Sequence, residues 1–167
     1  MPTPDLTERE AIKEVKARYF RYLDTRQWDR LRQLFTDDAK FEGTQRQYRG
    51  PDHFVSLLKQ WLTPSVSVHQ GHTPEIAFVS QNVARAIWPM FDKVEFPSRL
   101  QEGQFAGSFG FVGYGYYEEE YKKGDDSLWR ISLLRLVRLR LVPITESTLA
   151  ASTRNVTSAD WLAMERE

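Results

Sequence analysis

The chain has 167 residues, contains no cysteine, and carries 23 basic and 23 acidic side chains. The lack of cysteine excludes disulfide bonds, thiolate catalysis and cysteine-ligated zinc, and the zero net charge gives no electrostatic reason to expect nucleic acid or an anionic membrane as a partner. No apolar run reaches the ~20 residues of a membrane-spanning helix, and the charged N-terminus lacks the apolar core of a signal peptide, so we expect a soluble, cytoplasmic protein.

The first third of the chain has the pattern of helices. Thr7 and Glu10 have capping-box spacing, which predicts that a helix starts near Glu8, and apolar residues at helical spacing continue it to about Leu23. The predicted helices span residues 8–23, 28–35 and 50–62, with a turn at 36–38 and a short strand or hairpin from residue 39 to 42.

From Ser65 onward the pattern is typical of strands. The predicted strands span residues 66–78, 83–96, 108–123 and 128–142, with turns at 81–82 and 123–126 and a loop at 97–107. Gly71 and Pro74 are expected to bend the first strand. Along the second strand, alternation places Trp88, Met90 and Asp92 on one face.

Helices followed by an antiparallel meander indicate an α+β fold. The long, glycine-punctuated strands are expected to curve into a cone around the N-terminal helices, as in a cystatin-like α+β barrel. Residues 1–145 would form this single domain, and residues 146–167 a tail that belongs to it or packs on a neighbouring subunit. The cavity between the inner sheet face and the first helix is the expected site.

His69 and His72 stand mid-chain, three residues apart. On a regular strand an odd offset places them on opposite faces, which favours one structural and one exposed histidine, although a bulge at Gly71 would change this. The sharper alternatives are a general base, since histidine titrates near neutral pH, or a metal pair. A metal site is disfavoured because no third ligand lies at motif distance.

Other polar residues have both a structural and a functional interpretation. Tyr19 and Asp24 fit a core tyrosine and a turn aspartate. Asp92, on an otherwise apolar face, must meet a cavity or a partner, because unpaired burial is costly. Four arginines, at positions 130, 135, 138 and 140, mark a solvated edge, an oligomer interface or, for Arg138, a pairing with Asp92. The aromatic run that contains Tyr114 and Tyr116 is either a pocket wall or plain core.

These residues together resemble the nuclear-transport-factor-2-like superfamily, and within it the SnoaL-like branch that includes bile acid 7α-dehydratase and, more remotely, scytalone dehydratase. The resemblance covers residues 12–141. The similar stretches are residues 12–24, 28–29, 68–76, 88–92 and 121–129. Residues 41–43 and 97–107 depart from the bile acid enzyme, and in such folds these segments shape the substrate pocket.

The resemblance implies a cofactor-free and metal-free lyase that acts on a small hydrophobic carbonyl compound. Its catalytic residues would be Tyr19, Asp24 and His69: His69, oriented by Asp24, would remove a proton made acidic by the carbonyl, and Tyr19 would hydrogen-bond the developing oxyanion. The substrate-binding residues would be Asp92, Arg138, His72, Tyr114, Tyr116 and Trp88. Of these, His72 would support the residues that contact the substrate rather than contact it directly. The relatives' assembly implies a homo-oligomer, with a trimer favoured.

The leading expectation is therefore a dehydratase for a hydroxylated cyclic or aromatic ketone. A C–C lyase, a dehydrohalogenase or an isomerase would use the same base. A non-catalytic ligand-binding module is the alternative from another class, since a fold does not fix a function. The Asp24–His69 pair favours an enzyme, because a binding module needs no base with an orienting carboxylate.

Overall fold

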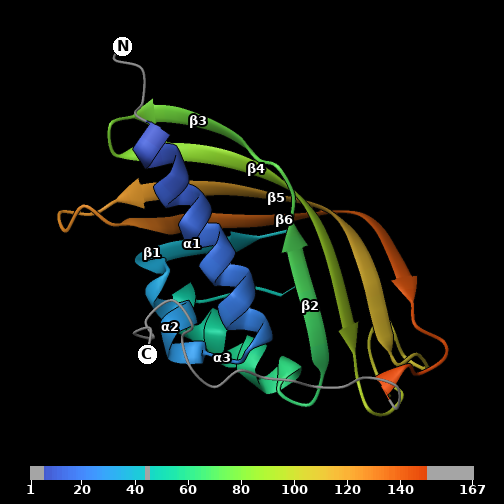
Figure 1. Cartoon of the computed structure of the whole chain (residues 1–167). Coiled ribbons are helices and arrows are strands. Elements are labelled where there is room, and N and C mark those ends of the chain that lie inside the picture. Colours follow the sequence, from blue (N-terminus) through green and yellow to red (C-terminus); the bar gives the residue numbers. More distant parts are fainter. Residues whose placement is uncertain (1–5, 44–45, 150–167) are drawn as a thin grey trace, which may run out of the picture.

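The structure, a computed structural model, describes residues 6–43 and 46–149. These residues form three helices and a six-stranded sheet, joined by loops (Figure 1). The helices are α1 (Leu6–Asp24), α2 (Trp28–Gln33) and α3 (Gly50–Leu62). The strands are β1 (Phe35–Glu42), β2 (Val66–Gly71), β3 (Glu75–Ser80), β4 (Val83–Glu95), β5 (Gly110–Lys123) and β6 (Trp129–Pro143).

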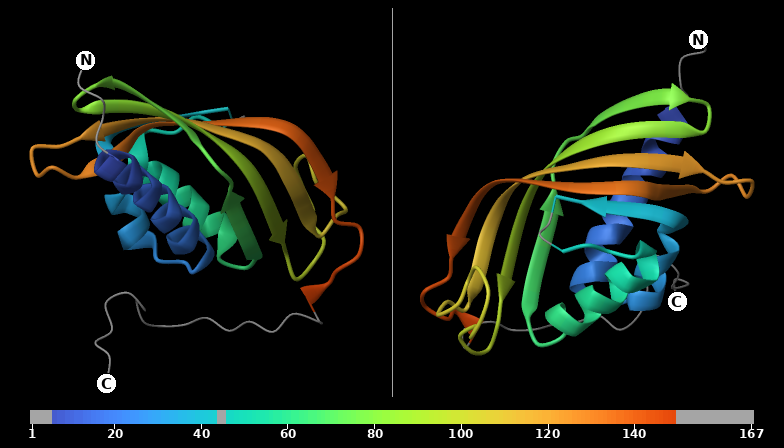
Figure 2. Two further views of the ribbon diagram at one scale, coloured as in Figure 1. Left: turned by 45° about the horizontal axis from the view of Figure 1, so that its top comes forward. Right: turned by 180° about the vertical axis from the view of Figure 1, so that it is seen from behind.

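The sheet follows the order β1-β6-β5-β4-β2, and β3 also pairs with β4. All pairings are antiparallel except that of β1 with β6, which is parallel. The long strands bend over the helices, so that α1 and α3 lie on the concave side (Figure 2). Among the described residues the sheet ends at β1 and β2, so the predicted cone is open along one side rather than a closed barrel. The α+β prediction is confirmed.

Helix α1 forms because its apolar residues repeat every three to four positions. Ile12, Val15, Tyr19 and Leu23 are buried by this repeat, and the helix ends at Asp24, one residue beyond the predicted end. The capping-box prediction is wrong, because Thr7 already lies inside α1 rather than at its N-cap. The helix starts at Leu6, two residues before the predicted start.

The region after α2 departs from the prediction. Phe35 belongs to β1 rather than to the second helix, and residues 36–38, predicted as a turn, lie within the same strand. The reason is non-local: Phe35 pairs with Ile131 of β6, nearly a hundred residues later. Phe35 and Ala39 are buried there, and the register shift between Phe35 and Lys40 is a bulge or irregularity in β1.

The predicted strand over residues 66–78 is two strands, β2 and β3, and both pair with β4. The break falls between Gly71 and Glu75, where the sequence predicted a bend. Gly71 has a packing reason to be glycine, because a Cβ there would lie 2.6 Å from a ring atom of Phe20. Close contact between β2 and α1 is therefore possible at this point.

The core fills the space between the helices and the concave sheet face. The predicted alternation along β4 is confirmed: Trp88, Met90, Asp92 and Val94 are all buried. Within the described residues, no helix is both long and apolar enough to cross a membrane. Of the predicted tail, only residues 146–149 are described; the remainder lies outside the described residues.

Candidate active site

Asp24 and His69 meet where the end of α1 packs against β2. The carboxylate of Asp24 lies 2.7 Å from the His69 Nδ1 atom, and its other oxygen accepts the backbone N–H of His69 at 2.7 Å. Ser67 donates a third hydrogen bond to Asp24 at 2.8 Å. The ring of His69 is thus fixed, and only 7% of its side chain is exposed.

The loop after α1 is fastened to β2 by Arg26. Its backbone has a positive φ of 62°, which turns the chain sharply after the helix. The guanidinium donates to the Leu23 carbonyl, the Ser67 hydroxyl and the Ser65 carbonyl at 2.7 to 2.8 Å. Because Leu23 and Ser67 flank the dyad in sequence, these bonds hold Asp24 and His69 in register.

A second pair of charges lies on the other side of His69. Asp92 on β4 is 1% exposed and binds Arg138 of β6 through two parallel hydrogen bonds of 2.5 and 2.6 Å. The Nε2 atom of His69 is 4.0 Å from Asp92. His69 therefore stands between two carboxylates, and a guanidinium balances the second one.

Two backbone features make room for this pair. Gly113 lies opposite Asp92 on β5, and a Cβ there would be 2.1 Å from an Asp92 oxygen and 2.2 Å from an Arg138 nitrogen. On β6, Leu139 is an extra residue, since Arg138 and Arg140 face the consecutive residues Gly115 and Tyr114. This bulge turns both Arg138 and Leu141 toward the cavity.

The dyad and the ion pair open into a cavity of about 600 Å³ beneath the sheet. Its lining is mainly apolar and aromatic, with Trp61 from α3 and Phe111 from β5 lying nearly parallel at a centroid distance of 6.1 Å. The loop after β4 contributes Leu100 and Phe105 to the lining. Few polar groups converge in this apolar chamber, an arrangement typical of small-molecule sites.

Two tyrosines complete the polar end of the cavity. Tyr19 from α1 and Tyr117 from β5 both line it, with their ring centroids 5.9 Å apart. Burial raises the pKa of Tyr19 well above its usual value, and the neighbouring Tyr117 and Glu119 raise it further. Burial likewise raises the pKa of Tyr117. Both hydroxyls therefore keep their protons and, because they are hydrogen-bonded to each other, they can donate to a ligand as a pair.

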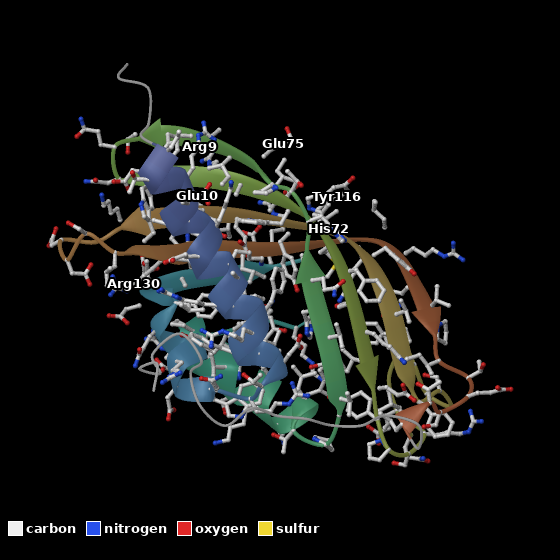
Figure 3. The ribbon with its side chains drawn as sticks, viewed as in Figure 1. Arg9, Glu10, His72, Glu75, Tyr116 and Arg130 are labelled. Carbon is white, nitrogen blue, oxygen red and sulfur yellow. The ribbon has the colours of Figure 1, made fainter. Side chains whose placement is uncertain are left out.

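The structure brings five predicted residues together: Tyr19, Asp24, His69, Asp92 and Arg138. It does not bring the other four to the cavity. Tyr114 and Tyr116 lie on the outer face of β5 because side chains alternate along a strand. His72 is exposed beyond the tip of β2, where its N–H binds the Pro89 carbonyl (Figure 3). Trp88 is buried in the core and does not line the cavity.

Tyr117 lines the cavity although it was not predicted as a site residue. The same alternation that places Tyr114 and Tyr116 outside places Gly113, Gly115 and Tyr117 inside, so the signal was present once Asp92 fixed the inner face. Trp61, Phe105 and Phe111 were not predicted as cavity walls either, and they come from three separate segments. In the described ranges, no group of three or more His, Asp or Glu side chains is placed to hold a metal ion.

Comparisons with known proteins identify the family of this chain. A family model described as the SnoaL-like domain matches residues 4–135. The probable cyclase FGR4 of Gibberella zeae is 28% identical over 146 residues, which cover 77% of this chain and 89% of that protein. The nearness to bile acid 7α-dehydratase stays a prediction.

Two solved structures illustrate the shared fold. A proposed scytalone dehydratase of Novosphingobium aromaticivorans has a TM-score of 0.72 and 21% identity, over 86% of this chain and 91% of that chain. Hexachlorocyclohexane dehydrochlorinase LinA-type3 of Novosphingobium barchaimii has a TM-score of 0.69 and 22% identity, over 83% and 91%. At these identities the likeness shows the fold. With the family model matching most of its length, this chain belongs to the SnoaL-like domain family of the nuclear-transport-factor-2-like superfamily.

Proposed function

We propose that this protein is a cofactor-independent dehydratase that eliminates water from a hydroxylated cyclic or aromatic carbonyl compound. The observation that carries the proposal is the Asp24–His69 dyad at the polar end of an apolar cavity. A carboxylate oxygen of Asp24 lies 2.7 Å from the Nδ1 atom of the His69 ring, so Nε2 is the nitrogen of His69 that faces the cavity. A ligand-binding module needs no base that is oriented in this way.

The residues can carry out an elimination with a balanced transfer of protons. His69 Nε2 takes a proton from the carbon next to the substrate carbonyl, while Tyr19 donates a hydrogen bond to the oxygen of the developing enolate. His69 then returns that proton to the departing hydroxyl, which leaves as water. Asp24 stays ionised and holds the imidazolium in place.

The other polar groups would position the substrate. Arg138 donates N–H groups to both oxygens of Asp92 and to the Met90 sulfur, and a guanidinium has five donors. A second substrate oxygen can therefore bind the remaining donors that face the cavity. The apolar walls exclude water, which strengthens each of these polar contacts.

The same base would serve two other reactions, a different elimination and an isomerisation. Loss of chloride needs only the first proton transfer, and isomerisation returns the proton to another carbon. The similar fold of a dehydrochlorinase makes the first of these a reasonable alternative. A retro-aldol C–C lyase differs, because its base removes a proton from a substrate hydroxyl rather than from carbon.

An isotope experiment tests the proposed reaction. Substrate deuterated at the carbon next to the carbonyl should react more slowly than the protiated compound, or should lose its label to water, because His69 removes that hydrogen. Tyr19→Phe should lower kcat and leave binding largely unchanged, since its hydroxyl acts mainly in the transition state. Products that are one carbon shorter, with the label fully retained, would show that the enzyme is a C–C lyase instead.

We also propose that copies of this chain associate through the outer face of the sheet, in a homo-oligomer with a trimer favoured. Tyr114 and Tyr116 are 44% and 36% exposed there, and Val68 on β2 and Leu139 on β6 are also exposed. Apolar groups gathered on one face usually mark an interface.

Sedimentation velocity would measure the assembly state directly. We expect the wild-type protein to sediment as an oligomer, and Tyr114→Glu to shift it toward the monomer because a carboxylate would then be buried at the interface. A wild-type protein that is monomeric at micromolar concentration would contradict the proposal.

A further inference from the structure

A network of charged and polar groups is sealed in the core behind the cavity tyrosines. The ammonium nitrogen of Lys16 on α1 lies 2.6 Å from one carboxylate oxygen of Glu119 on β5. The hydroxyl of Tyr121 donates a hydrogen bond to the other oxygen of Glu119. All three residues are at most 3% exposed. Burying an ion pair is often no more stable than burying apolar residues of the same volume, so stability alone does not account for this network.

The position of Lys16 links the network to the site. Lys16 precedes Tyr19 by one helical turn, and its ammonium nitrogen lies 3.5 Å from the centroid of the Tyr117 ring and 4.3 Å from that of Tyr19. Both tyrosines line the cavity, whereas Lys16 and Glu119 do not. The cation therefore contacts the two rings from within the core, while their hydroxyls belong to the polar end of the cavity.

We propose that Lys16 is a positioning residue for the reaction: its ammonium, held by Glu119, strengthens the Tyr19 and Tyr117 hydroxyls as hydrogen-bond donors to the substrate oxygen. This proposal rests on the proposed function for the role of Tyr19. A cation on a ring face is attracted by the ring electrons, and the attraction is strongest where water is excluded. As the tyrosine hydroxyl shares its proton with an enolate, the ring becomes more electron-rich and the attraction grows.

The surrounding charges make this effect dependent on pH. The ionisable groups near the network are Tyr19 on α1 and Tyr117, Glu119 and Tyr121 on β5, while Asp92 and Arg138 act on Tyr117 from β4 and β6. Desolvation lowers the pKa of Lys16 from 10.5 to about 8, although Glu119 opposes this. When Lys16 loses its proton, Glu119 remains as an unbalanced negative charge near both phenols and weakens them as donors.

The first test needs no substrate. Protein labelled with [13Cζ]tyrosine and [13Cε]lysine is titrated by NMR, with the tyrosine signals assigned from single Tyr→Phe variants. We expect the Tyr19 and Tyr117 signals to show an inflection near pH 8 that coincides with the titration of the Lys16 signal. Tyr48, which lines the cavity from the segment before α3, should show no such step. If Tyr19 and Tyr117 do not follow Lys16, the proposal is wrong.

The second test uses variants of matched shape. Lys16→Met with Glu119→Gln removes both charges together, so that neither is left unpaired in the core, and Lys13→Met removes an exposed lysine from the same helix. With the substrate of the isotope experiment, kcat should fall about tenfold in the double variant with KM little changed, the scale of one desolvated cation–π contact. Lys13→Met should behave as wild type.

The two tests separate this proposal from the proposed function. A folded double variant with unchanged kcat would overturn the role of Lys16 while leaving the dyad intact. If the double variant does not fold, the NMR titration of the wild-type protein still decides whether the protonation state of Lys16 affects the Tyr19 and Tyr117 hydroxyl groups. Loss of the elimination mechanism, in contrast, would appear in the isotope experiment and would leave the NMR result unaffected.

Discussion

His69→Ala is expected to lower turnover by at least ~100-fold, the usual contribution of a general base. The imidazole is the only base among the described residues whose free nitrogen faces the cavity while its other nitrogen is fixed by a carboxylate. Folding should be nearly unaffected, because the ring lies at a cavity and alanine fits β2. Steady-state kinetics together with circular dichroism would measure the two effects separately.

Asp24→Asn should cost a similar factor for a different reason. The amide keeps the shape of the carboxylate but can present its NH2 group to Nδ1, which would move the imidazole proton to Nε2 and leave no lone pair toward the substrate. It also cannot stabilise the imidazolium that forms during the reaction. His53, a histidine on α3 that does not line the cavity, offers a control. His53→Ala should leave turnover close to wild type. Full activity in both dyad variants would exclude His69 as the base.

The dyad could be predicted from the sequence because its members lie in unbroken stretches at the end of a helix and in the middle of a strand. Asp24 closes the apolar repeat of α1, and His69 begins the motif that Gly71 and Pro74 interrupt. Their contact itself is non-local, and it was the family resemblance rather than the spacing that joined them. Arg138 was predicted as a pocket residue in the same way, whereas its pairing with Asp92 was one of several interpretations that the residues left open.

The sequence could not show features that depend on distant partners. The parallel pairing of β1 with β6 overrides local turn signals at residues 36–38, because Phe35 gains a buried position beside Ile131. The bulge at Leu139 reverses the alternation of β6, so that Leu141 lines the cavity. The burial of Lys16 is equally hidden, since Lys13 and Glu14, the charged residues that precede it on α1, are exposed and Glu119 lies 103 positions away.

The aromatic residues of β5 show how one fixed position would have corrected a prediction. Tyr114 and Tyr116 were assigned to the pocket with no register for the strand. Once Asp92 is taken as inward-facing, its partner Gly113 must face inward too, and the alternation assigns Tyr117 to the cavity and its neighbours to the outer face. A one-residue error in register moves every side chain of a strand to the wrong face.

Arg138→Ala is expected to destabilise the protein by about 3–5 kcal/mol and to abolish most of its activity. The Asp92 carboxylate is almost fully buried and has both oxygens on this guanidinium, so the variant would leave an uncompensated charge in the core. The unpaired carboxylate would also stand 4.0 Å from His69 Nε2, where it would attract the proton that the reaction must return. Urea denaturation would measure the loss in the free energy of unfolding.

A second variant distinguishes the structural role of the pair from its role in the reaction. Asp92→Leu with Arg138→Met replaces both charges by apolar side chains of similar size, a change that is often neutral or stabilising when a buried ion pair is removed whole. We expect this double variant to recover most of the stability lost in Arg138→Ala but to remain poorly active, because no guanidinium is left to bind the substrate oxygen. If it were as active as wild type, the pair would serve only the fold, and substrate positioning would have to be assigned to Tyr19 and Tyr117 alone.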